Sequence, residues 1–257
     1  MKFCSLISGS SANCLYVESN NSALLIDCGL SGKSVSDTFN MLELDFDKVE
    51  GILVTHEHID HVKGIGVLAR KYKKKIYISK ATYSALPCSV GEIPKENLVF
   101  ISNKEFELDN FKITPFSASH DAIDPHGFKI EADKNLYVVT DTGAVTKDMT
   151  DMAKNTDFAF IESNHDLYML THGNYPPELI RRIMSDNGHL PNKEAAQFSV
   201  WLAQNGAKHI MLGHISDDNN TEGLAKKETE SALKLSGFDN VEVYTASKHF
   251  PTKIIEF

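Results

Sequence analysis

The chain has 257 residues, 42% of them hydrophobic, and a formal net charge of −9 at pH 7. This length and apolar content suit an α/β protein with a sizeable core, and we expect a single domain over residues 1–257. The acidic balance argues against binding nucleic acid over a broad surface, because such binding relies on neutralising phosphates. A local field at one site can still oppose the global charge.

No segment approaches the roughly 20 consecutive apolar residues that a membrane helix needs, so no membrane partner is expected. The first residues, Met1–Ser5, lack the apolar stretch of a signal peptide. The four cysteines form no CxxC pair, and we interpret them as reduced thiols. Together these features predict a cytoplasmic protein, and they leave its oligomeric state open.

The first half of the chain alternates short β-forming runs with helical segments. The polar loop Ser8–Asn13 comes first, and Gly/Ser loops of this kind are usually plain turns, although they allow close approach to a ligand. Alternating or continuous apolar runs predict strands, and apolar residues at helical spacing predict helices. The expected strands are 15–17, 23–26, 49–54 and 76–79, and the expected helices are 34–44 and 62–72.

The second half carries most of its strands first and its helices later. The segments 128–131 and 136–140 are expected to pair as a hairpin, and a proline in the first turn favours a helix over 176–184. The other expected strands are 98–100, 106–108, 111–116, 158–161, 209–212, 241–244 and 253–257, and the other expected helices are 193–204 and 221–235.

Five of the expected strands end in side chains that can bind metal ions. These residues are Asp27, His56, His120, Asp141 and His214. Strand ends are rigid, and in layered α/β folds functional sites form at the carboxyl ends of strands. A single histidine after a strand is more often packed or solvated than a ligand. Three histidines and two aspartates from separate strands favour one shared site.

The run HEHIDH at residues 56–61 is the densest cluster of such groups. Residues two apart in an extended turn point to the same side, so we expect His56 and His58 to hold one ion, whereas Glu57 points away. Asp60 and His61 stand at the turn into the next helix, where they are expected to hold a second ion nearby.

The other strand ends complete the two sets of ligands. We expect His120 to join the first ion, His214 the second, and Asp141 to bridge both, because a carboxylate has two oxygens. Imidazole and carboxylate ligands suit zinc, manganese and iron alike. Two ions roughly 3.5–4 Å apart share a hydroxide nucleophile and clamp the attacking and leaving oxygens. Their charge gives an acidic protein a positive pocket for an anionic substrate.

The HxHxDH run, with Asp27 before it and His120, Asp141 and His214 after it, resembles the metallo-β-lactamase fold superfamily. Further motifs resemble its YycJ branch, also called WalJ or VicX, over nearly the whole length of the chain. These motifs are Ser8–Ser11, Ser119–Ala122, Glu162–Asp166, Arg181–Asp186 and Gly188–Leu190. The chain departs from the branch at two positions, where Ala12 replaces a glycine and Pro191 replaces a serine or threonine.

The resemblance implies an α+β fold, a four-layer αββα sandwich with a dinuclear metal centre at the edge between the sheets. For the YycJ branch it implies a metal-dependent phosphodiesterase, a 5′-to-3′ exonuclease on DNA. In some bacteria this branch is linked to DNA repair and to a cell-wall two-component system. Asp27 in this superfamily supports the metal loop through hydrogen bonds and is not itself a ligand.

Two residues are assigned to catalysis, Asp60 as a ligand of the second ion and His189 as a phosphate contact or general acid. The acid protonates the leaving 3′-oxygen, and a metal-bound water is the alternative donor. The alternative for His189 is a helix-capping or core histidine.

Three residues of the Glu162–Asp166 motif are expected near the site. Glu162 is expected to support His214, with a solvated strand end as its alternative. Asn164 and His165 are expected to bind substrate together with His189, although His165 is equally suited to orienting a ligand histidine.

Two other classes of function stay open. The first is another hydrolase on the same scaffold, namely a phosphodiesterase of cyclic nucleotides or small molecules, a thioesterase, or an RNA-processing enzyme. The second is a non-catalytic regulator in cell-wall signalling, although scaffolding does not need a fully equipped metal site.

Overall fold

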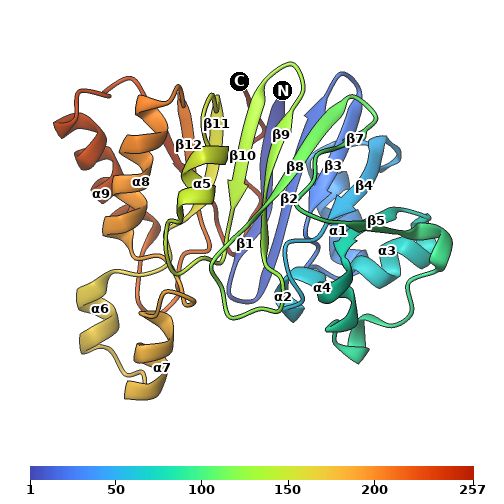
Figure 1. Cartoon of the computed structure of the whole chain (residues 1–257), viewed down its shortest axis with the longest axis horizontal. Helices are drawn as coiled ribbons and strands as arrows, with labels where there is room; N and C mark the ends of the chain where they lie inside the picture. Colours follow the sequence, from blue (N-terminus) through green and yellow to red (C-terminus); the bar gives the residue numbers. More distant parts are fainter.

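Two seven-stranded sheets stack face to face in the computed structural model, which describes all residues from 1 to 257, and helices cover both outer faces (Figure 1). The first sheet contains, in spatial order, β14 (Ile255–Glu256), β1 (Lys2–Gly9), β2 (Ala12–Ser19), β3 (Ser22–Ile26), β4 (Val49–Leu53), β5 (Lys75–Ser79) and β6 (Leu98–Ile101). The second contains β13 (Glu242–Thr245), β12 (His209–Gly213), β11 (Phe158–Glu162), β10 (Asn135–Val139), β9 (His126–Glu131), β8 (Phe111–Ser117) and β7 (Phe106–Leu108).

The two sheets share one pattern of strand direction. In the first, β14, β1, β2 and β3 pair antiparallel, and β3, β4, β5 and β6 pair parallel. In the second, β7 to β10 pair antiparallel and β10 to β13 pair parallel. Parallel strands bring their carboxyl ends to the same edge, where sites form in layered folds. Each sheet therefore offers one set of strand ends for a shared site.

Helices lie on the two outer faces and at the lower edge of the sheets in Figure 1. On the side of the first sheet are α1 (Gly32–Met41), α2 (Ile59–Val62), α3 (Ile65–Tyr72) and α4 (Lys80–Ser84), with short 3₁₀ turns η1 (Phe46–Lys48), η2 (Cys88–Val90) and η3 (Lys95–Asn97). On the side of the second are α5 (Lys147–Met152), α8 (Asn192–Gln204) and α9 (Glu222–Leu235), while α6 (Leu167–His172) and α7 (Pro177–Ile183) project below them. None of the helices has the length and hydropathy needed to cross a membrane.

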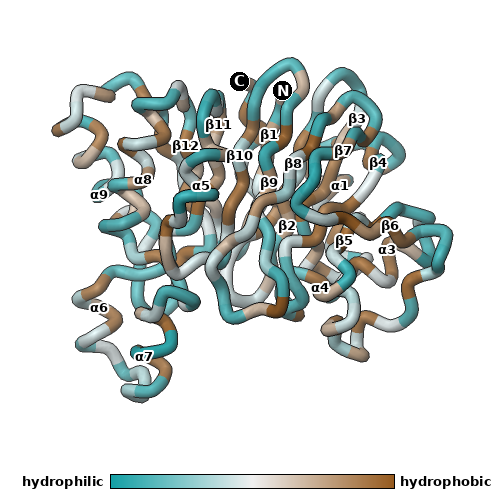
Figure 2. The backbone as a smooth tube through the Cα atoms, in the orientation of Figure 1, coloured by the Kyte–Doolittle hydropathy of each residue, from teal (hydrophilic) through white to brown (hydrophobic).

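Three hydrophobic cores hold the four layers together. Between the sheets, the Phe3 and Phe158 rings lie 4.8 Å apart. Under the first helical layer, Tyr16 meets Phe39 edge to face at 5.6 Å, and under the second, Tyr137 meets Phe198 at 6.0 Å. Figure 2 shows hydrophobic segments running through the strands, with mostly hydrophilic loops around them. The predicted α+β fold, an αββα sandwich, is confirmed.

The sequence did not predict β1, and it predicted one helix where α2 and α3 are separate. In β1, the polar residues Ser5 and Ser8 are buried, so the strand shows no clean alternation of polar and apolar residues. The helix breaks at Gly64, where a Cβ would lie 2.2 Å from the carbonyl oxygen of Leu30 and 2.7 Å from Cys28 Sγ. Close packing against the turn after β3 therefore sets this boundary.

Tyr137 offers a test of the core beneath α8. Its hydroxyl is buried without a hydrogen-bond partner, and its ring stacks on Phe116 at 4.9 Å. Because an unsatisfied buried polar group costs about 1–3 kcal/mol, we expect Tyr137→Phe to raise the free energy of unfolding by about 1 kcal/mol in urea titrations.

Tyr16 is the matched control, because its buried hydroxyl donates to Glu18 Oε2 at 2.7 Å. Tyr16→Phe removes a satisfied bond and is expected to lower the unfolding free energy by about 1 kcal/mol. Equal effects of the two substitutions would contradict this account of the core.

Candidate metal centre

All seven predicted ligands come from chain segments that meet at the lower edge of the sheets, where α2 lies in Figure 1. His56 follows β4, Asp141 follows β10 and His214 follows β12. Asp27 after β3, Asp141 and His214 have backbone φ angles of 59°, 51° and 51°. Residues with a side chain rarely adopt this left-handed conformation, which concentrates at functional sites. The surrounding structure therefore holds these strand ends in a strained backbone.

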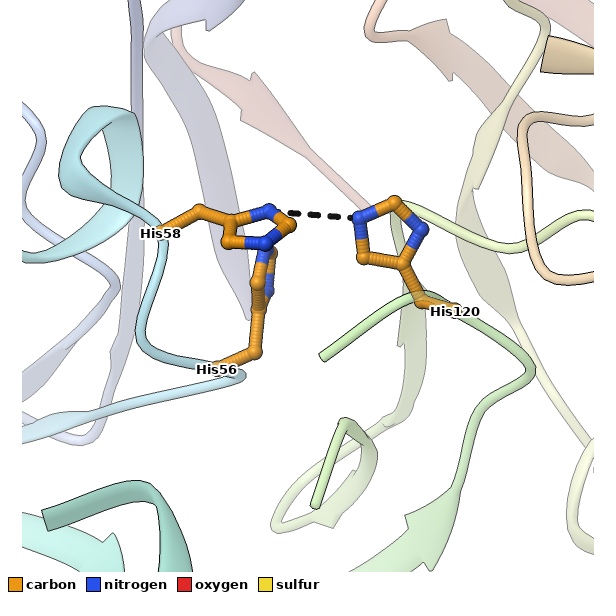
Figure 3. A group of neighbouring side chains, drawn as sticks. All are labelled: His56, His58 and His120. Carbon is orange, nitrogen blue, oxygen red and sulfur yellow. Dashed lines mark hydrogen bonds between the residues drawn. The ribbon is translucent and has the colours of Figure 1, made fainter. Parts of the chain in front are cut away.

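His56, His58 and His120 form one cluster that could hold a metal ion, which we call the first half-site. Their ligand atoms all lie within 4.8 Å of one another, and the three rings point together in Figure 3. His58 Nδ1 lies 3.3 Å from His120 Nε2. His120 Nδ1 donates to the carbonyl oxygen of Gly188 at 3.1 Å, which leaves the lone pair on Nε2 for a ligand. Burial is the main cause that lowers the pKa of both His56 and His120, and the neutral ring is the form that binds a metal.

Asp60, His61 and His214 form another cluster that could hold a metal ion, which we call the second half-site. His61 Nε2 lies 3.3 Å from Asp60 Oδ2 and 3.2 Å from Asp141 Oδ2. Burial disfavours a charged His61, but Asp141 and Asp27 outweigh this effect and raise its pKa well above the ordinary value. The second half-site therefore stabilises positive charge.

Asp141 lies between the two half-sites. Its Oδ1 is 3.4 Å from His214 Nδ1 and 3.8 Å from His120 Nε2, while Oδ2 faces His61. The side chain is 3% exposed. Burial tends to raise the pKa of Asp141, but His214 and His61 outweigh it and hold the pKa well below the ordinary value. An ionised carboxylate in this position faces ligands of both half-sites.

The donor set fits divalent metal ions. His56 Nε2 and His214 Nε2 are buried and have no hydrogen-bond partner, although a buried polar atom normally finds one. Both histidines belong to clusters with other imidazoles or carboxylates, and these are ligands for zinc, manganese and iron. The residues are thus suited to divalent metal binding.

Asp27 holds the loop of the HEHIDH run in place. Its two oxygens accept from the Thr55 amide at 2.8 Å, from Thr55 Oγ1 at 2.7 Å and from His61 Nδ1 at 2.7 Å. The bond to Nδ1 turns His61 Nε2 toward the half-site, which is the usual work of a residue behind a metal ligand.

Glu162 orients His214 as Asp27 orients His61, and it also binds His189. Its Oε1 accepts from His214 Nδ1 at 2.7 Å and from His189 Nδ1 at 2.8 Å. Its Oε2 accepts from the amides of Thr142 and Leu190. Burial opposes ionisation of Glu162, but the two histidines outweigh it and lower the pKa to about 2.

His189 and Asn164 line a pocket of about 220 Å³ beside His214. His189 is 20% exposed, and Glu162 followed by Asp141 overcomes the effect of burial to raise its pKa to about 9. Asn164 Nδ2 donates to the carbonyl oxygen of His214 at 2.9 Å. His165 is 1% exposed and does not line this pocket, so its part in substrate binding stays a prediction.

Glu57 has no role in the predicted site, and in the structure it joins two of the loops that form the site. Glu57 Oε1 accepts from the Ile123 amide at 2.8 Å and so ties the HEHIDH loop to the loop that carries His120. Arg182 likewise reaches Asp121 Oδ2 at 2.6 Å from α7. Neither contact has a local sequence signal, because the joined residues are 66 and 61 positions apart.

Comparison with known proteins gives one consistent family. The family described as "Beta-lactamase superfamily domain" matches residues 23–215. The chain is 39% identical to "Exodeoxyribonuclease YycJ" of Bacillus anthracis over 99% of this chain and 98% of that protein. It is 38% identical to "Exodeoxyribonuclease WalJ" of Streptococcus pneumoniae serotype 2 (strain D39 / NCTC 7466), over 99% and 97%.

Among solved structures, the metallo-beta-lactamase fold protein YhfI from Bacillus subtilis matches with a TM-score of 0.71 and 18% identity, covering 98% of each chain. This match supports the fold, and the two full-length relatives confirm the resemblance to the YycJ branch. The chain belongs to the beta-lactamase superfamily, within the YycJ/WalJ family of metal-dependent hydrolases.

Proposed function

We propose that this protein is a metal-dependent exonuclease that hydrolyses DNA from the 5′ end. The observation that carries the proposal is the pair of half-sites joined by the buried carboxylate of Asp141. The full-length relatives named exodeoxyribonucleases favour DNA as the substrate. A DNA substrate also agrees with a cytoplasmic setting, in which the four unpaired cysteines stay reduced.

The proposed assembly holds two divalent ions, zinc, manganese or iron. His56, His58 and His120 would hold one ion and Asp60, His61 and His214 the other, with Asp141 placed to serve either. When bound, such a pair of ions lowers the pKa of water and stabilises negative charge on the attacking and leaving oxygens of a phosphodiester.

His189 is the proposed proton donor to the leaving 3′-oxygen. Its Nδ1–H is held by Glu162 Oε1 at 2.8 Å, so the ring keeps one orientation beside the pocket. The carboxylate also favours the protonated ring, because it raises the pKa of His189 against the effect of burial. Because Nδ1 is bound to Glu162, Nε2 is the nitrogen left to donate a proton, and His189 lines the pocket, so the protonated ring has the chemistry of a general acid there.

The pocket beside His214 suits a phosphate-bearing substrate. Its lining includes Arg182, Asn164, Ser10 and Ser216, which supply positive charge and hydrogen-bond donors. The two carboxylates in the lining already have partners, since Asp217 binds Lys248 and Asp218 accepts from the Tyr175 hydroxyl. Their negative charge is thereby reduced. The Arg182 side chain, which pairs with Asp121 outside the lining, is 60% exposed.

The first test is a nuclease assay with 5′-phosphorylated single- and double-stranded DNA in the presence of manganese or zinc. Wild type is expected to release mononucleotides from the 5′ end, and Asp141→Asn is expected to release none because it removes the shared charge. Asp239→Asn, at an exposed position, is the matched control and should retain full activity.

Three other results, from this assay or from the same assay run with other substrates, would overturn the proposal. These are release from the 3′ end, equal activity of Asp141→Asn, or hydrolysis of RNA, a cyclic nucleotide or a thioester but not DNA. A non-catalytic regulator in cell-wall signalling is distinguished by complementation. If the protein is such a regulator, the phenotype caused by its loss is restored equally by wild type and by His58→Ala.

Metal removal gives a second test. Native-purified protein is expected to contain two divalent ions per chain by elemental analysis, and chelation is expected to lower its melting temperature. Ions present at about 1,000 times their dissociation constants stabilise a fold by about 4 kcal/mol each. For Asp141→Asn, chelation should change the melting temperature much less than it does for wild type. A wild-type melting temperature that does not change on chelation would contradict the assignment of these residues as metal ligands.

Glu162→Gln tests the residue behind two histidines. An amide weakens the orientation of His189 and His214 without emptying the space, and substitutions of such supporting residues cost about 10–100-fold in activity or metal affinity. We expect a loss of kcat in this range, with Glu96→Gln, at an exposed position, as the control. A kcat within twofold of the wild-type value would contradict this role of Glu162.

A further inference from the structure

We propose that Asn13, in the first residues of β2, positions the ligands of the second half-site. It contacts Asp60 and His61 directly, and it reaches His214 through Ser8. The inference rests on the proposed metal-dependent function and gives a task to the Ser8–Asn13 loop, which the sequence alone left as a turn or a ligand contact.

The side chain of Asn13 is buried among these groups. Its residue is 3% exposed. Nδ2 lies 3.0 Å from His61 Nε2 and 3.3 Å from Asp60 Oδ2, and it donates to the carbonyl oxygen of Gly9 at 3.0 Å. One amide hydrogen is therefore committed to the loop, and the other faces the half-site.

The direction of the Asn13 amide follows from its partners. Its Oδ1 accepts from the Gly9 amide at 3.1 Å, and a backbone N–H can only donate. The NH₂ group must then point to Asp60 and His61. An imidazole nitrogen has a single lone pair, so if His61 Nε2 served as a metal ligand, the second amide hydrogen would be left to Asp60 Oδ2. Asn13 would thus orient the Asp60 carboxylate when the half-site is loaded.

Ser8 extends the contact to the opposite sheet. Its Oγ donates to Asn13 Oδ1 at 3.1 Å and accepts from the His214 amide at 2.9 Å. Ser8 is 1% exposed, and His214 is the residue with a left-handed backbone after β12. One turn of the first sheet therefore contacts both the Asp60–His61 segment and the strand end of the second sheet.

The backbone of Asn13 is held as firmly as its side chain. Its carbonyl oxygen accepts from the Gly29 amide at 2.8 Å. A Cβ on Gly29 would lie 1.7 Å from the carbonyl oxygen of Asp60 and 2.8 Å from the Asn13 amide nitrogen. The segments of Asn13, Gly29 and Asp60 are therefore in direct backbone contact, and none of these contacts involves the first half-site.

The test compares Asn13→Ala and Ser8→Ala with wild type by metal titration. Protein is dialysed against graded zinc or manganese, and bound ions are counted by elemental analysis. Asn13→Ala is expected to lower the binding affinity for one of the two ions by about 10–100-fold and to leave the affinity for the other unchanged. The nuclease activity of Asn13→Ala should return when the metal concentration is raised. Ser8→Ala should lower the affinity for the same ion by a smaller factor.

Two controls separate this role from a general loss of structure. Ser11→Ala alters an exposed residue of the same turn and should titrate like wild type. In chelator, Asn13→Ala is expected to melt below wild type, because Gly9 loses its two hydrogen bonds with the Asn13 amide. This loss acts on the fold as a whole, so it cannot by itself weaken the binding of one ion and spare the other. If Asn13→Ala lowers the affinities for both ions equally, or lowers neither, the proposal is wrong. A wild type that binds two ions but cleaves no DNA would refute the proposed nuclease, whereas the metal titration would still test the role of Asn13 independently.

Discussion

The buried charge of Asp141 is the constraint on which the rest of the centre depends. An ionised carboxylate that is 3% exposed loses most of its hydration, and it is stable only among partners of opposite charge. Histidines from both sheets supply this environment, His61 from one side and His214 from the other. The same need for positive charge is what a pair of divalent ions would satisfy.

The two sheets contribute to the centre in complementary ways. The first sheet supplies the HEHIDH run together with Asp27, and the second supplies His120, Asp141 and His214. The apolar core between the sheets sets their spacing, because rings such as Phe3 and Phe158 pack across it. The geometry of the ligands thus depends on core packing as well as on the loops that carry them.

The strand ends were predictable from sequence because ligand residues follow apolar runs directly, as His56 follows β4 and His214 follows β12. The supporting contacts were less accessible. Glu57 meets Ile123 and Asn13 meets His61 only after distant segments have docked, and neither pairing leaves a local pattern. Strand β1 escaped prediction for a related reason, since the buried polar side chain of Ser8 finds a distant partner when its Oγ accepts from the His214 amide.

The left-handed backbone at Asp27, Asp141 and His214 has a consequence for how the fold opens. Each such residue costs about 1–3 kcal/mol, which neighbouring contacts must offset. Without a metal those contacts are hydrogen bonds and ion pairs between polar groups, such as the bonds of Thr55 to Asp27 and of the His214 amide to Ser8, whereas the layers behind this edge are held by apolar packing. Local unfolding would therefore begin at the strand ends and leave the sheets intact. Loading with metal would then protect the amides of these turns from solvent exchange more than those of the strands behind them.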